Sequence, residues 1–205
     1  LLSACHDDDH DSYHSGDNIP KNNITNPVVS TPTAYNQTDM SATAGESVVM
    51  TYKMLGINNK EVQATALVFT PKTAPPAKGW PIVVWAHGTT GVADICAPSR
   101  SQLNSYIKAM IEGLLTAGYV VVAPDYEGLG EPANNELHPF LNVKSEAFSI
   151  TDAVVAARNY LGNKVSNRWM TVGHSQGGHA ALSAAQYQSR AQLDYKGTVA
   201  VAPAS

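Results

Sequence analysis

The stretch GHSQGG, residues 173–178, decides the fold that we expect for this chain. It follows a short apolar run, 169–173, that predicts a buried strand, and it precedes a segment, 177–190, whose apolar residues have helical spacing. A serine on so sharp a strand-to-helix turn needs glycines on both sides, because the neighbouring chain passes close to it. The helix that begins there points backbone N–H groups at developing negative charge. We therefore expect Ser175 to be a nucleophile.

A second glycine-containing turn, HGTTG at residues 87–91, comes directly after the apolar run 81–86. The loop after such a strand is the place where this strand–turn–helix architecture provides one donor of an oxyanion hole. We expect the backbone N–H groups of Thr89 and Gln176 to bind the oxyanion of a tetrahedral intermediate. If residues 173–178 were only a tight turn that packs a helix onto a sheet, this second motif would be left unexplained.

The rest of the folded region alternates between expected strands and expected helices. Strand-like alternation in 47–55 and 61–70, joined by the turn-forming run GINNK, predicts an antiparallel hairpin. The strands expected after it are 81–86, 119–123, 169–173 and 198–202, and the expected helices are 101–116, 145–161 and 177–190. Strands separated by helices predict a mostly parallel sheet with helices on both faces. The fold class is therefore α/β, of the α/β-hydrolase type, with an N-terminal antiparallel hairpin and with its C-terminal part missing.

Histidines lie close to both motifs, but none is expected to be the catalytic base. His87, next to Gly88, is expected to brace the oxyanion loop by hydrogen bonds, and His174 should point away from the nucleophile on its turn. His138 follows the second buried strand and is expected to line the pocket. His179 sits in the helix behind the elbow, which is a poor place for a base.

Acidic residues do not supply an obvious catalytic partner either. Asp125 and Glu127 resemble a carboxylate pair, but their place before the elbow favours bracing of a loop and shaping of the pocket, and Asp152 is expected to cap or pair locally. In this fold the acid and then the histidine of a triad follow the serine. After the elbow the chain has only Asp194 and His179. We expect both triad partners to lie beyond residue 205, and the 205-residue chain to be inactive or nearly so, because a serine hydroxyl without a base is a poor nucleophile.

The N-terminal residues predict export rather than a folded element. LLSAC, residues 1–5, resembles the lipobox of bacterial lipoproteins, a signal-peptide remnant cut before a cysteine that is lipidated, and the alternative is a chance match. Residues 6–40 are polar, so we expect a disordered tether there and an incomplete hydrolase domain at 41–205. The His and Asp residues within 6–14 could bind a cation, but their spacing matches no structural site and favours a solvated acidic spacer. We expect lipidation at Cys5 and a place in the cell envelope, or otherwise secretion.

Composition excludes several classes of protein. The chain has 205 residues with 43% apolar side chains, enough for one domain with a buried core. Its 13 Lys and Arg neither cluster nor outnumber the 17 Asp and Glu, which argues against nucleic-acid binding. No apolar run reaches the roughly 18 residues of a membrane-spanning helix. We expect no metal or other cofactor, a small-molecule or lipid ester as substrate, and membrane contact only through a lipid at Cys5.

Four stretches together resemble the secretory lipases, the fungal lipase A type and its bacterial relatives. They are HGTTGVADICAPS at 87–99, PDYEGLG at 124–130, HPFL at 138–141 and GHSQGGHAAL at 173–182. The resemblance spans about residues 48–203 and implies a Ser–Asp–His triad with Ser175 as nucleophile, Thr89 and Gln176 at the oxyanion positions, hydrolysis of acylglycerols or simpler esters, and a lid after the last expected strand. It also implies that Cys96 pairs with a cysteine further along the chain. A serine peptidase, an acyltransferase and a non-catalytic surface lipoprotein are the alternatives.

Overall fold

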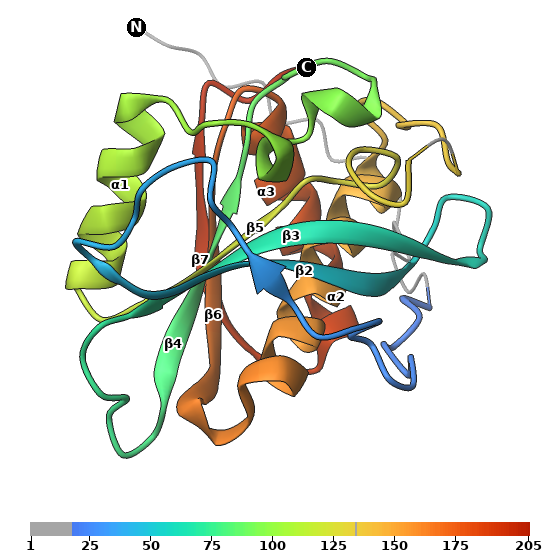
Figure 1. Cartoon of the computed structure of the whole chain (residues 1–205). Helices are drawn as coiled ribbons and strands as arrows, with labels where there is room; N and C mark the ends of the chain where they lie inside the picture. Colours follow the sequence, from blue (N-terminus) through green and yellow to red (C-terminus); the bar gives the residue numbers. More distant parts are fainter. Residues whose placement is uncertain (1–17, 134) are drawn as a thin grey trace, which may run out of the picture.

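The computed structural model describes residues 18–133 and 135–205, which form one mixed sheet with helices on both faces (Figure 1). The strands are β1 (Thr33–Ala34), β2 (Ala44–Leu55), β3 (Glu61–Pro71), β4 (Trp80–Ala86), β5 (Val120–Pro124), β6 (Val165–His174) and β7 (Asp194–Val201). The α-helices are α1 (Ser105–Thr116), α2 (Val143–Leu161) and α3 (Gln176–Tyr187). The strand order is β1-β2-β3-β5-β4-β6-β7. The α/β fold expected from the sequence is confirmed.

Strand pairing places the two glycine-containing turns side by side. β1, β2 and β3 pair antiparallel, and β3 pairs antiparallel with β5. From β5 onward the pairs β5–β4, β4–β6 and β6–β7 are all parallel. Parallel strands end at the same edge of a sheet, so the loops after β4 and β6 leave from one edge. Because Ala86 lies opposite Gly173 in the β4–β6 register, the HGTTG and GHSQGG turns begin next to each other.

Helices cover both faces of the sheet and create two cores. On one face α1 packs Ile111 and Leu115 against a cluster that includes Phe69 of β3 and Trp85 of β4. On the other face α2 and α3 pack over a larger cluster that reaches from β2 to β6. Figure 1 shows α1 on one side of the sheet, and α2 and α3 on the other. The central strands are therefore buried on both faces, which is why a segment such as β5, with the sequence VVVAP, is a continuous apolar run.

Several element ends differ from those expected. α1 begins at Ser105 rather than at 101, because the Asn104 side chain caps it by accepting the Ile107 N–H at 2.8 Å. β6 begins at Val165 rather than at 169. Residues 167 and 168 near its start are polar and exposed, so an apolar pattern does not indicate this part of the strand. β7 begins at Asp194 rather than at 198, and its register against β6 shifts in this first part. The α3 helix ends at Tyr187, and the residues up to 191 form a 3₁₀ turn.

Residues 18–40 pack against the domain, so the expected disordered tether is wrong for this part of the chain. β1 pairs with β2, and Tyr35 and Met40 are 4% and 2% exposed. Asn22 donates a hydrogen bond of 2.8 Å to the Asp152 carboxylate in α2. A few apolar side chains in an otherwise polar segment are enough to dock it. Residues 1–17, which contain Cys5 and the run rich in His and Asp, lie outside the described residues.

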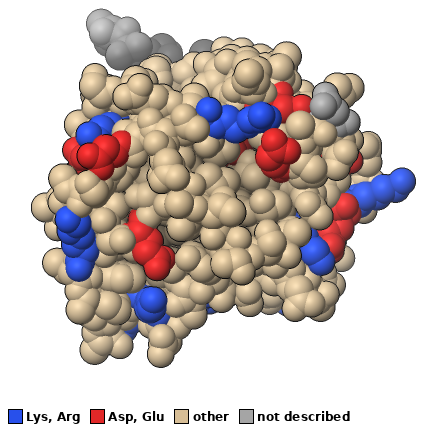
Figure 2. All heavy atoms as spheres, in the orientation of Figure 1, with Lys and Arg blue, Asp and Glu red and all other residues tan. Residues whose placement is uncertain are grey.

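Charged side chains are scattered over the face of the molecule shown in Figure 2. No helix within the described residues is long and apolar enough to cross a bilayer. Over the same part of the chain, no three His, Cys, Asp or Glu side chains come together as metal ligands, and Cys96 is a free thiol.

Candidate active site

Ser175 lies in a sharp turn between β6 and α3. Its φ of 58° and ψ of −121° form a combination that a residue with a side chain rarely adopts, at a cost on the order of 1–3 kcal/mol. Its backbone N–H donates to the carbonyl of Val201 at 3.0 Å, and its carbonyl accepts the N–H of Ala204 at 3.1 Å. The bend is therefore held by the end of β7 and by the residues that follow it.

Close packing explains the glycines around Ser175. A Cβ on Gly173 would lie 1.9 Å from the carbonyl oxygen of Gly177, and a Cβ on Gly177 would lie 1.8 Å from that of Ala86. A Cβ on Gly178 would lie 2.9 Å from the backbone of residue 203. These distances are shorter than any van der Waals contact, so β4 and α3 approach the turn only because these positions lack side chains.

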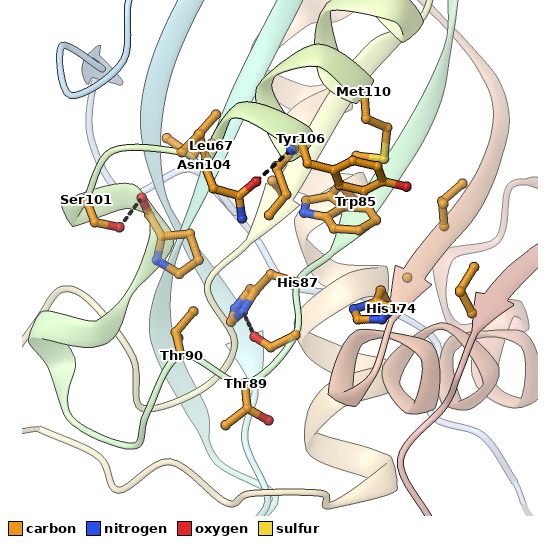
Figure 3. Close-up of a pocket in the computed structure, with 18 of the residues that line it drawn as sticks. Leu67, Trp85, His87, Thr89, Thr90, Ser101, Asn104, Tyr106, Met110 and His174 are labelled. Carbon is orange, nitrogen blue, oxygen red and sulfur yellow. Dashed lines mark hydrogen bonds between the residues drawn. The ribbon is translucent and has the colours of Figure 1, made fainter.

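The loop after β4 lies directly against the turn. A Cβ built on Gly88 would be 3.7 Å from the Cβ of Ser175 and 3.4 Å from the carbonyl oxygen of His174. Thr89 comes next and borders the adjoining cavity (Figure 3), whereas Gln176 is the first residue of α3. N–H groups in the first turn of a helix have no acceptor within the helix. The fold therefore brings Thr89 and the N-terminus of α3 to the same edge of the sheet as Ser175.

His87 ties the loop after β4 to the loop after β5. Its buried ring lies with Nε2 3.1 Å from the carbonyl oxygen of Asp125 and with Nδ1 2.6 Å from that of Gly88. Tyr126 stacks on this ring with centroids 4.3 Å apart and donates its hydroxyl to the His87 carbonyl at 2.7 Å. Burial lowers the pKa of His87 to about 4, so the ring is neutral near pH 7. Both ring nitrogens face backbone carbonyls rather than Ser175.

Asp125 is a fully buried carboxylate that joins three segments. Its Oδ1 accepts the Ser99 N–H at 2.9 Å, and its Oδ2 accepts the hydroxyls of Ser99 and Thr65, each at 2.5 Å. Burial raises the pKa of Asp125 to about 6, against the effect of these donors. Glu127 is likewise engaged, since it accepts the Ser145 hydroxyl at 2.5 Å. Neither carboxylate lines the cavity, so both act on the loops around it.

His138 is half-buried and is not among the residues that line the cavity. Its Nδ1 is 2.8 Å from the carbonyl oxygen of Glu127, and its Nε2 is 3.1 Å from the side-chain nitrogen of Gln176. That Gln176 nitrogen also donates to Oε1 of Glu146 at 3.4 Å. The loop that carries His138 therefore contacts the first residue of α3.

Glu146 of α2 and the partly exposed His179 of α3 form a pair that sequence reasoning missed. Glu146 is 0% exposed, and its Oε2 is hydrogen-bonded to Nδ1 of His179. Burial raises the pKa of Glu146, and the hydrogen bond to His179 acts in the opposite direction. A glutamate on the apolar side of a helix needs a partner, and this was the available signal. The partner is 33 positions away in the sequence, so spacing could not identify it.

Asp152 also pairs over a long distance rather than locally. It is fully buried in α2, and its carboxylate accepts Arg190 Nε at 2.7 Å and Arg190 Nη2 at 2.9 Å. The backbone N–H of Leu55 donates to the same carboxylate at 2.9 Å. Burial raises the pKa of Asp152, and Arg190 opposes that rise. This pair fastens α2 to the segment after α3 and to the end of β2.

An apolar cavity of about 620 Å³ adjoins the turn on the face that α1 covers (Figure 3). Its apolar walls include Leu67, Trp85, Leu103, Tyr106, Ile107, Met110, Val172 and Val201. Its polar residues include His87, Thr89, Thr90, Ser101, Asn104 and His174. The cavity therefore connects the loop after β4 and the end of β6 with a space suited to an apolar group.

Within the described residues, no histidine makes a hydrogen bond with the Ser175 hydroxyl. Both ring nitrogens of His87 and of His138, and Nδ1 of His179, face other partners. His174 is adjacent in sequence, but it is exposed and lines the cavity. The described part of the chain thus combines a strained serine turn and a neighbouring glycine loop without a base in contact with the serine.

Comparisons with known proteins agree with this fold. The sequence model of the family described as secretory lipase matches residues 98–203. Among solved structures, Candida antarctica lipase A in its closed state aligns with a TM-score of 0.69 and 24% identity, over 84% of this chain and 41% of that chain. A ligand-bound form of the rice cell wall degrading esterase LipA from Xanthomonas oryzae aligns with a TM-score of 0.59 and 28% identity, over 75% of this chain and 41% of that chain.

A putative hydrolase from Legionella pneumophila gives a similar result, with a TM-score of 0.60 and 26% identity over 75% of this chain and 41% of that chain. No curated protein sequence matches the chain. The chain therefore spans 41% of the length of each of these three solved chains.

Proposed function

Because this chain belongs to the secretory lipase family, we propose that it carries the nucleophile of a carboxylic ester hydrolase that works through an acyl-enzyme on Ser175. The observation that carries the proposal is the turn at Ser175, with its left-handed backbone and its closely packed glycines. Strain of this kind persists where the surrounding structure enforces it, and it is concentrated at functional sites. The same turn presents the nucleophile in known α/β-hydrolases.

In the proposed reaction, Oγ of Ser175 attacks the ester carbonyl while a base takes the hydroxyl proton. The carbonyl oxygen becomes an oxyanion and accepts hydrogen bonds from the backbone N–H groups of Thr89 and Gln176. One such donor contributes about 3–4 kcal/mol in comparable sites. The base then gives its proton to the departing alcohol, and the acyl group remains on Ser175. Water attacks this acyl-enzyme by the same route and releases the acid.

Five residues are proposed to support this site rather than to react. His87 and Asp125 hold the loops after β4 and β5 by the hydrogen bonds described above. Gly88 leaves room next to the nucleophile, since a side chain there would approach it closely. His174 is exposed at the cavity and is proposed to shape its entrance. His138 is proposed to support the first turn of α3.

The triad acid and base are proposed to lie outside residues 1–205. Both ring nitrogens of His138 and Nδ1 of His179 have other partners, and this chain covers only 41% of the solved chains that resemble it. The 205-residue chain alone should therefore hydrolyse p-nitrophenyl acetate no faster than its Ser175→Ala variant. Turnover by the 205-residue chain that Ser175→Ala abolishes would show that a base is present within it.

The function itself is tested on the product of the longest open reading frame that contains this sequence. That protein should hydrolyse p-nitrophenyl esters, and Ser175→Ala should reduce kcat by a factor on the order of 10⁶. Ser183→Ala is the matched control, since it removes a hydroxyl of the same helix that only donates to the His179 carbonyl at 2.9 Å. Equal loss in both variants, or no loss in Ser175→Ala, would contradict the assignment of the nucleophile.

The proposed substrate is an uncharged ester with an apolar acyl part. The cavity beside Thr89 has apolar walls, including Trp85, Tyr106 and Met110. The relatives from Candida antarctica and Xanthomonas oryzae are named a lipase and an esterase. A serine peptidase or acyltransferase would use the same turn. Rates on matched esters and anilides, with and without an alcohol acceptor, distinguish these reactions, and we expect the ester to be hydrolysed fastest.

Export and lipid anchoring form a separate proposal. The name of the secretory lipase family supports export, but it does not bear on the anchor. We propose a lipid on Cys5, a polar tether confined to the residues before 18, and a hydrolase domain that includes residues 41–205. Expressed from its whole reading frame in a bacterial host, the protein should fractionate with membranes, and Cys5→Ser should move it to the soluble exported fraction. An unchanged distribution in Cys5→Ser would exclude the lipid anchor.

A further inference from the structure

The side chain of Gln176 is enclosed beneath the turn that it follows. It is 1% exposed, and its Nε2 lies 3.1 Å from Nε2 of His138 and 3.4 Å from Oε1 of Glu146. A side-chain amide nitrogen carries two hydrogens, so it can donate to both neighbours at once. A buried amide left without such partners would be destabilising. The two contacts therefore explain how a polar side chain is accommodated at this position.

These contacts require one particular arrangement of protons. Nδ1 of His138 lies 2.8 Å from the Glu127 carbonyl oxygen, which can only accept, so Nδ1 carries the hydrogen. Nε2 of His138 is then free to accept a hydrogen from Gln176. Burial lowers the pKa of His138, which favours this neutral ring.

Glu146 holds the same helical turn at a second point. Its Oε1 accepts from Gln176, and its Oε2 is hydrogen-bonded to Nδ1 of His179. Residues three positions apart in a helix lie on the same face, so one carboxylate bridges two side chains of the first turn of α3. The carboxylate itself is completely buried in α2. A rigid helix therefore supports the turn from inside the core.

We propose that Glu146 and His138 are positioning residues that clamp the side chain of Gln176 and thereby fix the direction of its backbone N–H beside Ser175. The side chain and this N–H belong to the same residue, so holding the amide at its far end restricts rotation of the backbone that carries the donor. The inference rests on the proposed function only for the use of that N–H as an oxyanion donor. The clamp itself is a property of the folded chain.

Protonation of His138 should open the clamp. A charged ring carries hydrogen on both nitrogens, so Nε2–H would face the donor nitrogen of Gln176. Rotation of the Gln176 amide would restore the contact with His138 only by placing the amide oxygen against the Glu146 carboxylate. The groups that face His138 are the Glu127 carbonyl, the rings of Tyr126 and Phe140, and Gln176 with Glu146 and His179 behind it. His87 stacks on the Tyr126 ring, so its charge also acts on His138.

The clamp is tested by NMR on the 205-residue chain, without any need for ester turnover. In the folded protein, nitrogen shifts should show His138 as the tautomer with hydrogen on Nδ1. On acidification, the side-chain signals of Gln176 should move with the same midpoint as the ring of His138. In His138→Phe, which keeps a ring but removes the acceptor, the part of this movement that has the midpoint of His138 in the wild type should disappear.

Hydrogen exchange measures the effect on the donor itself. In Glu146→Gln and His138→Phe, exchange of the Gln176 backbone N–H should accelerate about tenfold or more, which corresponds to about 1.4 kcal/mol of local opening. Exchange in the β4–β6 pairing should stay unchanged, which separates loss of the clamp from general unfolding. Ser183→Ala, two turns further along α3, should leave the Gln176 N–H unchanged. Unchanged exchange in both clamp variants, or Gln176 signals that ignore the titration of His138, would overturn the proposal.

Reactivity distinguishes failure of this inference from failure of the proposed function. In the product of the longest open reading frame, the rate of Ser175 labelling by a fluorophosphonate should fall about tenfold or more in Glu146→Gln. An equal rate in Glu146→Gln and wild type would show that the clamp does not serve the site. Absence of labelling in the wild type would instead contradict the proposed nucleophile and leave the NMR result standing by itself.

Discussion

Asp125 and His87 are two buried titratable residues, and burial shifts their pKa values in opposite directions. Burial raises the pKa of Asp125 to about 6, because the ionised carboxylate loses its hydration. It lowers the pKa of His87 to about 4, because the charged ring is the form that burial disfavours. The folded protein therefore takes up a proton at Asp125 and releases one from His87 relative to the unfolded chain in the same acidic range.

The Asp125→Asn variant should separate these two effects. Between pH about 3.8 and about 6 the folded state binds more protons at Asp125 than the unfolded state, so this residue makes the free energy of unfolding fall as pH rises. His87 makes the free energy of unfolding rise with pH between about 4 and 6.5. It does so in the wild type and in the variant, so its effect cancels in the difference. The wild type minus Asp125→Asn difference should therefore fall by about 3 kcal/mol across the window, measured by urea unfolding at a series of pH values.

Asp39→Asn is the matched control, because Asp39 is exposed and hydrogen bonds to Ser41 lower its pKa rather than raise it. For this control, the free energy of unfolding of the wild type minus that of Asp39→Asn should not fall as pH rises. A wild type minus Asp125→Asn difference that is constant with pH would contradict a buried carboxylate with a raised pKa. It would mean that Asp125 is hydrated or paired in the folded protein in a way that the structure does not have.

For single residues, the sequence predicts the role of the glycines around Ser175 better than it predicts the hydrogen-bond partners of buried polar side chains. The spacing of glycines around Ser175 follows from local backbone geometry, so it can be recognised in one short stretch. The partners of Asp125 cannot, since Thr65 lies 60 positions earlier and Ser99 lies 26 positions earlier. Their contact depends on which loops the sheet order brings together. The Gln176 side chain was overlooked for the same reason.

At the scale of elements, the unit from β6 through the turn to α3 depends on positions that exclude a Cβ. A Cβ on Gly177, as in alanine, would lie only 1.8 Å from the carbonyl oxygen of Ala86. Gly113 in α1 is the opposite case, with nothing within 4 Å of an added Cβ. The two glycines are both helical and differ mainly in what surrounds them.

Gly177→Ala should destabilise the protein by about 3 kcal/mol or more, or prevent folding, because β4 and α3 must separate. Gly113→Ala should stabilise it by about 0.5–1 kcal/mol, because alanine has the higher helix propensity and meets no neighbour. Thermal unfolding followed by circular dichroism, with soluble yield as the second measurement, compares them. Equal melting temperatures for Gly177→Ala and wild type would contradict the close approach of β4 to the turn.

Element types could be predicted from the sequence where burial is complete, and element ends could not. β4 and β5 are apolar along their whole length because helices cover both faces of the sheet. β6 extends back to Val165 through the exposed Asn167 and Arg168, and β7 extends back to Asp194. At these ends a strand is defined by its hydrogen bonds to a neighbour, and no periodicity in its own residues indicates that.

At the scale of the whole molecule, the described chain has an open edge at β7. In the described residues β7 pairs with β6 alone, and its Val199 and Val201 are 48% and 50% exposed. An unpaired edge with apolar side chains favours association with another chain. The segment 18–40 shows the opposite behaviour, since it covers the other end of the sheet by adding β1 to β2. Sequence reasoning missed that docking because few apolar residues of this segment, among them Tyr35 and Met40, are buried.

Val199→Lys should reduce self-association of the 205-residue chain, because a lysine on an edge strand opposes pairing with a second strand. Sedimentation velocity over a range of protein concentrations measures the effect. Leu182→Lys is the matched control, since Leu182 is 49% exposed but belongs to α3 rather than to a strand. The same reduction in both variants would show that general charge, and not the β7 edge, controls association.

The central claim is that the turn at Ser175 presents a reactive serine beside the N–H groups of Thr89 and Gln176. Its most direct test is peptide mass spectrometry after reaction of the product of the longest open reading frame with a fluorophosphonate. We predict a single adduct on Ser175, absent in Ser175→Ala, and little labelling of the 205-residue chain in the same time. An adduct on another residue, or none on Ser175 in a folded protein, would contradict the account.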